Sequence, residues 1–159
     1  MCIRDRQVTA LMTITGLIDA PKADKEFLSI NGAQGFSTFY GYYMLEAMAM
    51  AGNYQGALDV IREYWGAMID LGATSFWEDF DINWIPNAAP IDELVPEGKK
   101  DIHGDCGAYC YVGFRHSLCH GWPSGPTSWL SRHILGVEVI EPGCRQVRIT
   151  PHLGDLQWV

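Results

Sequence analysis

The chain has 159 residues, of which 48% are apolar, and this suits one ordinary domain with a buried core. Its formal net charge of −8 argues against nucleic acid and against anionic membrane surfaces as partners, because both attract basic faces. No apolar run reaches the length of a membrane-spanning helix. We therefore expect a neutral partner, with no nucleic acid and no membrane involved.

The N-terminal part predicts one helix followed by a loop. The opening residues, Met1 to Arg6, resemble a translated adapter prefix rather than native sequence, so the predicted fold omits them. Apolar residues then recur at helical spacing over 7–18. Proline and glycine breakers indicate a polar loop over 19–35.

A helical hairpin is predicted next. Residues 37–51 are apolar over most of a helical circumference, which is typical of a helix buried on more than one side. Gly52 marks the end of this helix and Asn53 is a good cap for the next, which is amphipathic over 54–71. Because the connection is so short, the two helices should pack antiparallel.

A long stretch over 73–123 shows little regular pattern, and a loop of this length in a compact domain is usually functional. Helical signals return at Ser124, a candidate helix cap, and stop at Gly136.

The apolar period then changes from helical to alternating. Strands are predicted over 137–140 and 146–150, joined by a Pro-Gly turn. The change predicts a boundary between two domains, with a mainly α part over 7–135 and the start of an all-β part over 136–159.

Aromatic and acidic residues alternate in the ten-residue stretch that follows the predicted hairpin, from Gly72 to Asp81. A sugar site needs this mixture, since flat apolar faces stack on a pyranose ring and a carboxylate moves a proton or activates water. Glu78, next to Trp77, is the candidate for the chemistry. The alternative is a solvated loop carboxylate, which is the usual state of a charged side chain.

Further residues of the long loop are candidates for shaping a sugar pocket. Asp81 can hydrogen-bond sugar hydroxyls or remain solvated, and Trp77, Trp84 and Trp122 can stack on a ring or belong to the core. His120 can bind a hydroxyl or position the carboxylate. It stands four residues after His116, but no third metal ligand is evident nearby.

Metal and serine-hydrolase chemistry are not predicted. The spacing of Cys106 and Cys110 is Cys-x3-Cys, whereas zinc sites usually show matched Cys-x2-Cys pairs, so we expect buried free thiols and neither a metal nor a cofactor. The Gly-x-Ser-x-Gly pattern of serine hydrolases is absent.

Three motifs together resemble a known family. Gly-Ala-Thr-Ser-Phe-Trp-Glu at 72–78, His-Ser-Leu-Cys-His-Gly-Trp at 116–122 and Gly-Pro-Thr-Ser-Trp-Leu at 125–130 are similar to the C-terminal part of the catalytic domain of glycoside hydrolase family 78, the α-L-rhamnosidases. The segment over 136–152 resembles the start of that family's C-terminal β-sandwich domain.

The resemblance implies a fragment of an (α/α)6 six-hairpin barrel followed by the first strands of a β-sandwich. It implies an inverting glycosidase that cleaves terminal α-L-rhamnosides, with Glu78 as the general base and with Trp77 and His120 in the sugar pocket. The general acid of the family lies upstream of the matched region, so the chain alone should have little or no activity. The family usually has Asn where this chain has Cys119, which puts one hydroxyl contact in doubt.

Other functions remain open at this stage. A six-hairpin glycosidase with another sugar preference shares the implied fold. A non-catalytic carbohydrate-binding module would use the same aromatics without Glu78, and a helical scaffold for protein partners would use neither. The exact sugar, the aglycone and the oligomeric state are left undetermined.

Overall fold

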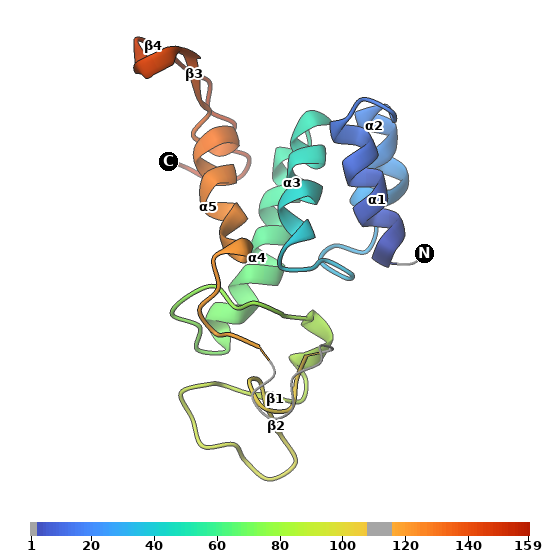
Figure 1. Cartoon of the computed structure of the whole chain (residues 1–159), viewed down its shortest axis with the longest axis vertical. Helices are drawn as coiled ribbons and strands as arrows, with labels where there is room; N and C mark the ends of the chain where they lie inside the picture. The colour runs from blue at the N-terminus through green and yellow to red at the C-terminus, as the bar shows by residue number, and fades with distance from the viewer. Residues whose placement is uncertain (1–2, 108–115) are drawn as a thin grey trace.

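The computed structural model describes residues 3–107 and 116–159, and within them the fold is mainly helical, as the sequence predicts. Figure 1 shows the helices side by side, with the long loop region at one end and a small β-hairpin at the other. The helices are α1 (Ile3–Ile14), α2 (Ala20–Ala23), α3 (Tyr40–Met50), α4 (Tyr54–Asp70) and α5 (Gly125–Trp129), and the strands are β1 (Ala88–Ala89), β2 (Lys100–Asp101), β3 (Val137–Glu141) and β4 (Gln146–Ile149).

The predicted helical hairpin is confirmed as α3 and α4, which run in opposite directions side by side (Figure 1). Gly52 has a φ of 77°, a left-handed conformation that glycine adopts without strain. The side chain of Asn53 accepts a hydrogen bond from the amide of Gly56 at 3.0 Å, so it caps α4 as predicted. Local signals therefore set the turn between the two helices.

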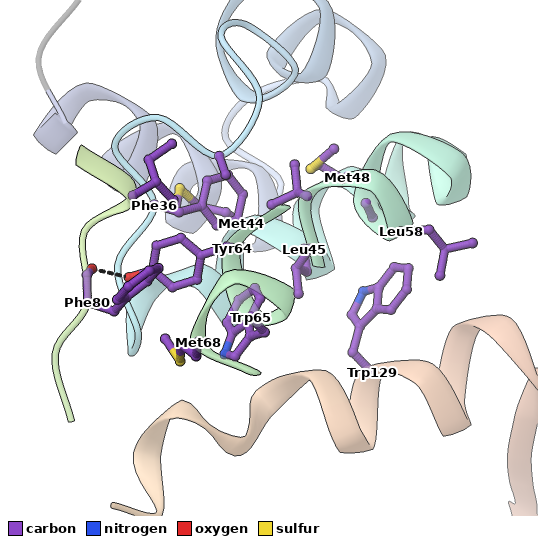
Figure 2. Packing of buried hydrophobic residues seen from close by; sticks show 14 of the residues in the cluster. Phe36, Met44, Leu45, Met48, Leu58, Tyr64, Trp65, Met68, Phe80 and Trp129 are labelled. Atoms are coloured by element: carbon purple, nitrogen blue, oxygen red, sulfur yellow. Dashed lines mark hydrogen bonds between the residues drawn. The ribbon is translucent and has the colours of Figure 1, made fainter. Parts of the chain in front are cut away.

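The core centres on α3 and α4, with contributions from α1, α2, α5 and the loop segments, and Figure 2 shows part of it. Tyr64 is fully buried on α4, and its hydroxyl donates to the carbonyl oxygen of Phe80. The indole Nε1 of Trp65 donates to the carbonyl oxygen of Pro123 at 3.1 Å. A buried polar group on an aromatic side chain needs a hydrogen-bond partner. Here both partners lie in the 73–123 region. Two hydrogen bonds therefore attach the irregular 73–123 region to α4.

The first helix begins before the predicted residue 7, so part of the omitted prefix enters the packed structure. Helix α1 already begins at Ile3, and the buried Arg6 donates to the carbonyl oxygens of Leu28, Gly32 and Gln34. Burial lowers the pKa of Arg6 to about 10, against the opposing effect of a nearby glutamate. Arg6 thus holds the connection between α1 and α3 in place.

The predicted polar loop over 19–35 is also partly wrong. It contains α2, and Asp19 caps the start of this helix. The backbone amide of Lys22 donates to the Asp19 carboxylate at 3.0 Å. A π-helical turn, Asp24–Leu28, follows directly. The side chains of Ala23 and Leu28 are fully buried, so two apolar positions in a polar stretch were enough to draw the segment against the core.

The β prediction is confirmed at the level of two strands. β3 and β4 pair antiparallel, and Arg148 forms an ion pair with Glu138 across the two strands at 3.1 Å.

The helix before these strands is shorter than predicted, since α5 gives way to a π-helical turn over Leu130–Ile134. Ser124 does not cap α5 with its side chain, because its hydroxyl donates to the carbonyl oxygen of Gly121 instead.

The C-terminal residues return to the helices. Arg62 of α4 forms a two-bond ion pair with Asp155, at 2.8 and 3.0 Å. The ring of His152 stacks on Tyr54, with centroids 3.9 Å apart.

Within the ranges that the structure describes, no helix is both long and apolar enough to cross a membrane.

Candidate functional site

Two segments that are distant in sequence pair along their backbones at the start of the long loop. The amide of Glu78 donates to the carbonyl oxygen of Ser117 at 2.8 Å, and the amide of His120 donates to that of Phe76 at 2.8 Å. The hydroxyl of Ser75 adds a bond to the Leu118 carbonyl oxygen at 2.5 Å. Two of the three motifs that carry the family resemblance, those at 72–78 and 116–122, are therefore in direct contact.

The carboxylate of Glu78 is held at the centre of this pairing. Its Oε2 accepts the amide N–H of Ser117 at 2.8 Å and lies 4.0 Å from Nδ1 of His120. Its side chain is 21% exposed, so it is partly shielded yet reachable from solvent. A carboxylate that is fixed by a backbone amide and open on one side is placed to accept a proton from a bound molecule.

The backbone carbonyl of Glu78 is fixed as well. It accepts hydrogen bonds from the hydroxyl of Thr38 and from the indole Nε1 of Trp122, the latter at 3.0 Å. Trp122 is 48% exposed, and its ring lies 4.3 Å from that of His120. The histidine and this tryptophan therefore both lie beside the glutamate.

Trp77 belongs to the core rather than to a sugar pocket. Its side chain has no exposed surface and packs edge-on against Phe80, with ring centroids 5.9 Å apart. A fully buried indole offers no face for a sugar ring to stack on. The substrate-binding role predicted for Trp77 is therefore wrong, and the alternative, a core position, is confirmed.

Asp81 and Trp84 lie in a different place from His120 and Trp122. They line a hollow of about 410 Å³ together with other residues that include Asp79, and Glu78 is not among its lining residues. The Oδ1 of Asp81 accepts the amide of Asn83 at 2.9 Å and its side-chain amide at 2.7 Å. Asp81 therefore caps a 3-10 turn, and the predicted site residues divide into two neighbouring groups.

His116 is buried between these two groups. Its ring lies 6.0 Å from that of Trp84 and 5.8 Å from that of His103. Burial lowers the pKa of His116, and the negative charge of Asp79 works against this effect. Because His116 is buried while His120 is part-exposed, the two do not form a paired face.

The thiol prediction is only partly confirmed. Cys106 is a buried free thiol, but Cys119 and Cys144 are exposed, and Cys110 lies outside the described residues. In the described ranges, no three His, Cys, Asp or Glu side chains gather as a metal-binding group.

Sequence reasoning missed two residues that hold Glu78. Ser117 acts through its backbone amide, which no sequence pattern reveals. Thr38 acts through its hydroxyl, and its place at the start of a predicted helix gives no sign of a contact forty residues away. No protein-family model matches the chain, and comparison with curated proteins finds no match. Function is therefore inferred from the geometry of the site and the resemblance of its motifs.

Proposed function

We propose that Glu78 is the general base of an inverting glycoside hydrolase that cleaves terminal α-L-rhamnosides. In this proposal the helices belong to an (α/α)6 catalytic barrel, and β3 and β4 begin a β-sandwich domain. The supporting observation is the position of the Glu78 carboxylate, which is held by the Ser117 amide with His120 and Trp122 at its sides.

The proposed chemistry follows from that position. A carboxylate has two oxygens, so one can keep the backbone N–H while the other takes a proton from water. The water then attacks the anomeric carbon from the face opposite the leaving group, and configuration inverts. His120 is near enough to bind the water or a ring hydroxyl, and the exposed face of Trp122 can pack on the apolar face of the sugar.

An inverting glycosidase also needs a carboxylic acid that protonates the leaving oxygen, and the two carboxyl groups stand about 6.5–9.5 Å apart to leave room for water. We propose that this acid comes from barrel hairpins outside the present chain. A base alone does not assist departure of the leaving group, so the isolated chain is expected to bind sugar without turnover.

The test uses the coding sequence extended upstream to the full barrel. With 4-nitrophenyl α-L-rhamnoside, the Glu78→Gln variant should lose about 10²–10⁴-fold in kcat, the range for loss of a general base. The control is Glu93→Gln, which changes an exposed glutamate in the same loop region and should leave kcat unchanged. Proton NMR of the first product should show the inverted anomer. Retained configuration, or full activity of Glu78→Gln, would rule out the proposed base.

The division of the site supports a second candidate, a carbohydrate-binding module without catalysis. The hollow lined by Asp81 and Trp84 excludes Glu78, so it can hold a sugar that never meets this carboxylate. Such a module would bind sugar equally well after Glu78→Gln, and its full-length form would release no nitrophenol. A panel of other nitrophenyl glycosides separates the remaining alternative, a six-hairpin glycosidase of different sugar preference.

A further inference from the structure

A group of aromatic side chains forms a shelf beside the candidate base. We define the aromatic shelf as Phe39, Tyr42, Tyr43 and Trp122, which line a single pocket of about 180 Å³. Phe39 lies 5.6 Å from Tyr43 and 5.7 Å from Trp122, measured between ring centroids. Phe39 and Trp122 remain 39% and 48% exposed, so their rings face outward although they also contact one another.

The shelf is built by the approach of α5 to the start of α3. A Cβ on Gly125 would lie 2.7 Å from the Cβ of Tyr42 and 2.9 Å from its ring, so only glycine permits this contact. Trp122 is anchored from the other side, because its indole Nε1 donates to the Glu78 carbonyl oxygen at 3.0 Å. The pocket is thus preformed, and a ligand does not need to order these rings on binding.

Three hydroxyls around the shelf are engaged within the protein. The hydroxyl of Ser124 donates to the Gly121 carbonyl oxygen at 2.7 Å, and that of Ser128 donates to the Gly125 carbonyl oxygen at 3.0 Å. Tyr42 hydrogen-bonds the carboxylate of Glu46, and burial together with this carboxylate raises the pKa of Tyr42. With these three hydroxyls engaged, the shelf offers mainly carbon surface, which disfavours a hydroxyl-rich ligand.

The volume of the pocket and the charge of the chain limit which class of ligand can bind. An apolar cavity of about 150 Å³ is known to hold one benzene ring, so the pocket has room for a single ring. The net charge of −8 disfavours an anion. We propose that the aromatic shelf binds one neutral, planar, apolar ring.

The proposal is tested on the chain itself by fluorine NMR, with its six tryptophans replaced by 5-fluorotryptophan. The resonance of Trp122 is assigned from the Trp122→Phe variant. One titration uses 4-methylphenol, a neutral planar ring, and a second uses methyl α-L-rhamnoside, which tests the proposed sugar site separately. We expect 4-methylphenol to shift the Trp122 resonance in a saturable way.

Variants show whether the ring occupies the shelf. Phe39→Leu and Tyr43→Leu should each weaken binding of 4-methylphenol by roughly two- to tenfold, as expected for loss of one aromatic contact. Trp158→Leu is the matched control, because Trp158 is 83% exposed and lies outside the shelf, and it should leave binding unchanged. Circular dichroism checks that each variant remains folded.

The other outcomes are decisive as well. The proposal is overturned if 4-methylphenol leaves the Trp122 resonance of the folded chain unmoved, or if only the rhamnoside moves it. It is also overturned if the resonance shifts with protein concentration alone, since a second copy would then cover the shelf. A shift with 4-methylphenol but none with the rhamnoside upholds the shelf and counts against the proposed sugar specificity.

Discussion

Two hydrogen bonds join Ser117 and Glu78 across the site: the Glu78 amide donates to the Ser117 carbonyl oxygen, and the Ser117 amide donates to Oε2 of the Glu78 side chain, each at 2.8 Å. The bond from the Glu78 amide fixes the backbone from which the side chain projects. The bond from the Ser117 amide holds the carboxylate itself. The catalytic proposal depends on this arrangement, because a carboxylate that rotated freely would rarely point at a bound sugar.

Removal of the Ser117 amide should release Glu78. Ser117→Pro deletes the N–H, and we expect it to lower the free energy of unfolding by about 1–3 kcal/mol, the range for an unsatisfied partner. Ser117→Ala is the control, since it keeps the amide and loses only the hydroxyl bonds to Cys119. Urea unfolding measures both variants. Equal stability of the two would mean that the amide bond contributes nothing.

The hydroxyl of Thr38 should matter more than its methyl group. Thr38→Val removes the donor to the Glu78 carbonyl oxygen but keeps the shape, so we expect a loss of about 1 kcal/mol. The loss stays modest because Trp122 donates to the same oxygen. Thr38→Ser keeps the hydroxyl, and its stability in urea should lie nearer to that of the parent chain. The reverse order would show that packing, not the bond, holds this segment.

The buried hydroxyl of Tyr64 should be costly to remove. Tyr64→Phe leaves the carbonyl oxygen of Phe80 without this donor in the core, and we expect a loss of about 1–3 kcal/mol. The same change at the half-exposed Tyr40 should stay within about 0.5 kcal/mol. Thermal and urea unfolding would both report the difference, and a neutral Tyr64→Phe would contradict it.

Arg6 should be required for stability although the sequence suggests a foreign prefix. Arg6→Met removes the donor to three carbonyl oxygens, and we expect a loss of about 1–3 kcal/mol or more. Arg6→Lys should recover little, because a compact ammonium cannot span the three positions that a guanidinium reaches. Unchanged urea midpoints for both variants would show that the N-terminal turn of α1 is dispensable.

His116 should make stability depend on pH. Burial lowers the pKa of His116 in the folded state, so as the pH falls through about 6.5 the unfolded chain takes up this proton first. The free energy of unfolding should therefore fall with decreasing pH in that window, although the nearby Asp79 and Glu78 weaken the effect and His103 strengthens it. His116→Phe should flatten the pH dependence, as measured by urea unfolding from pH 7.5 to 5. An identical slope in both proteins would exclude this role.

Sequence reasoning succeeded where local rules suffice. The hairpin of α3 and α4, its Gly52 and Asn53 turn, and the strands β3 and β4 follow from periodicity and capping, which act within a few residues. It failed at α2, where a short buried segment carries too few apolar positions to show a period.

The amino-acid sequence by itself determined the hairpin of α3 and α4, the strands β3 and β4, and the two motifs that contain the candidate base, His120 and Trp122. Only the tertiary structure decided that Trp77 is core and that Asp81 and Trp84 line a separate hollow. It also decided that Thr38, Ser117 and Arg6 hydrogen-bond distant segments of the chain. The physical reason is that burial and hydrogen bonding depend on neighbours from distant parts of the chain, whereas helix and turn formation depend on the nearest residues.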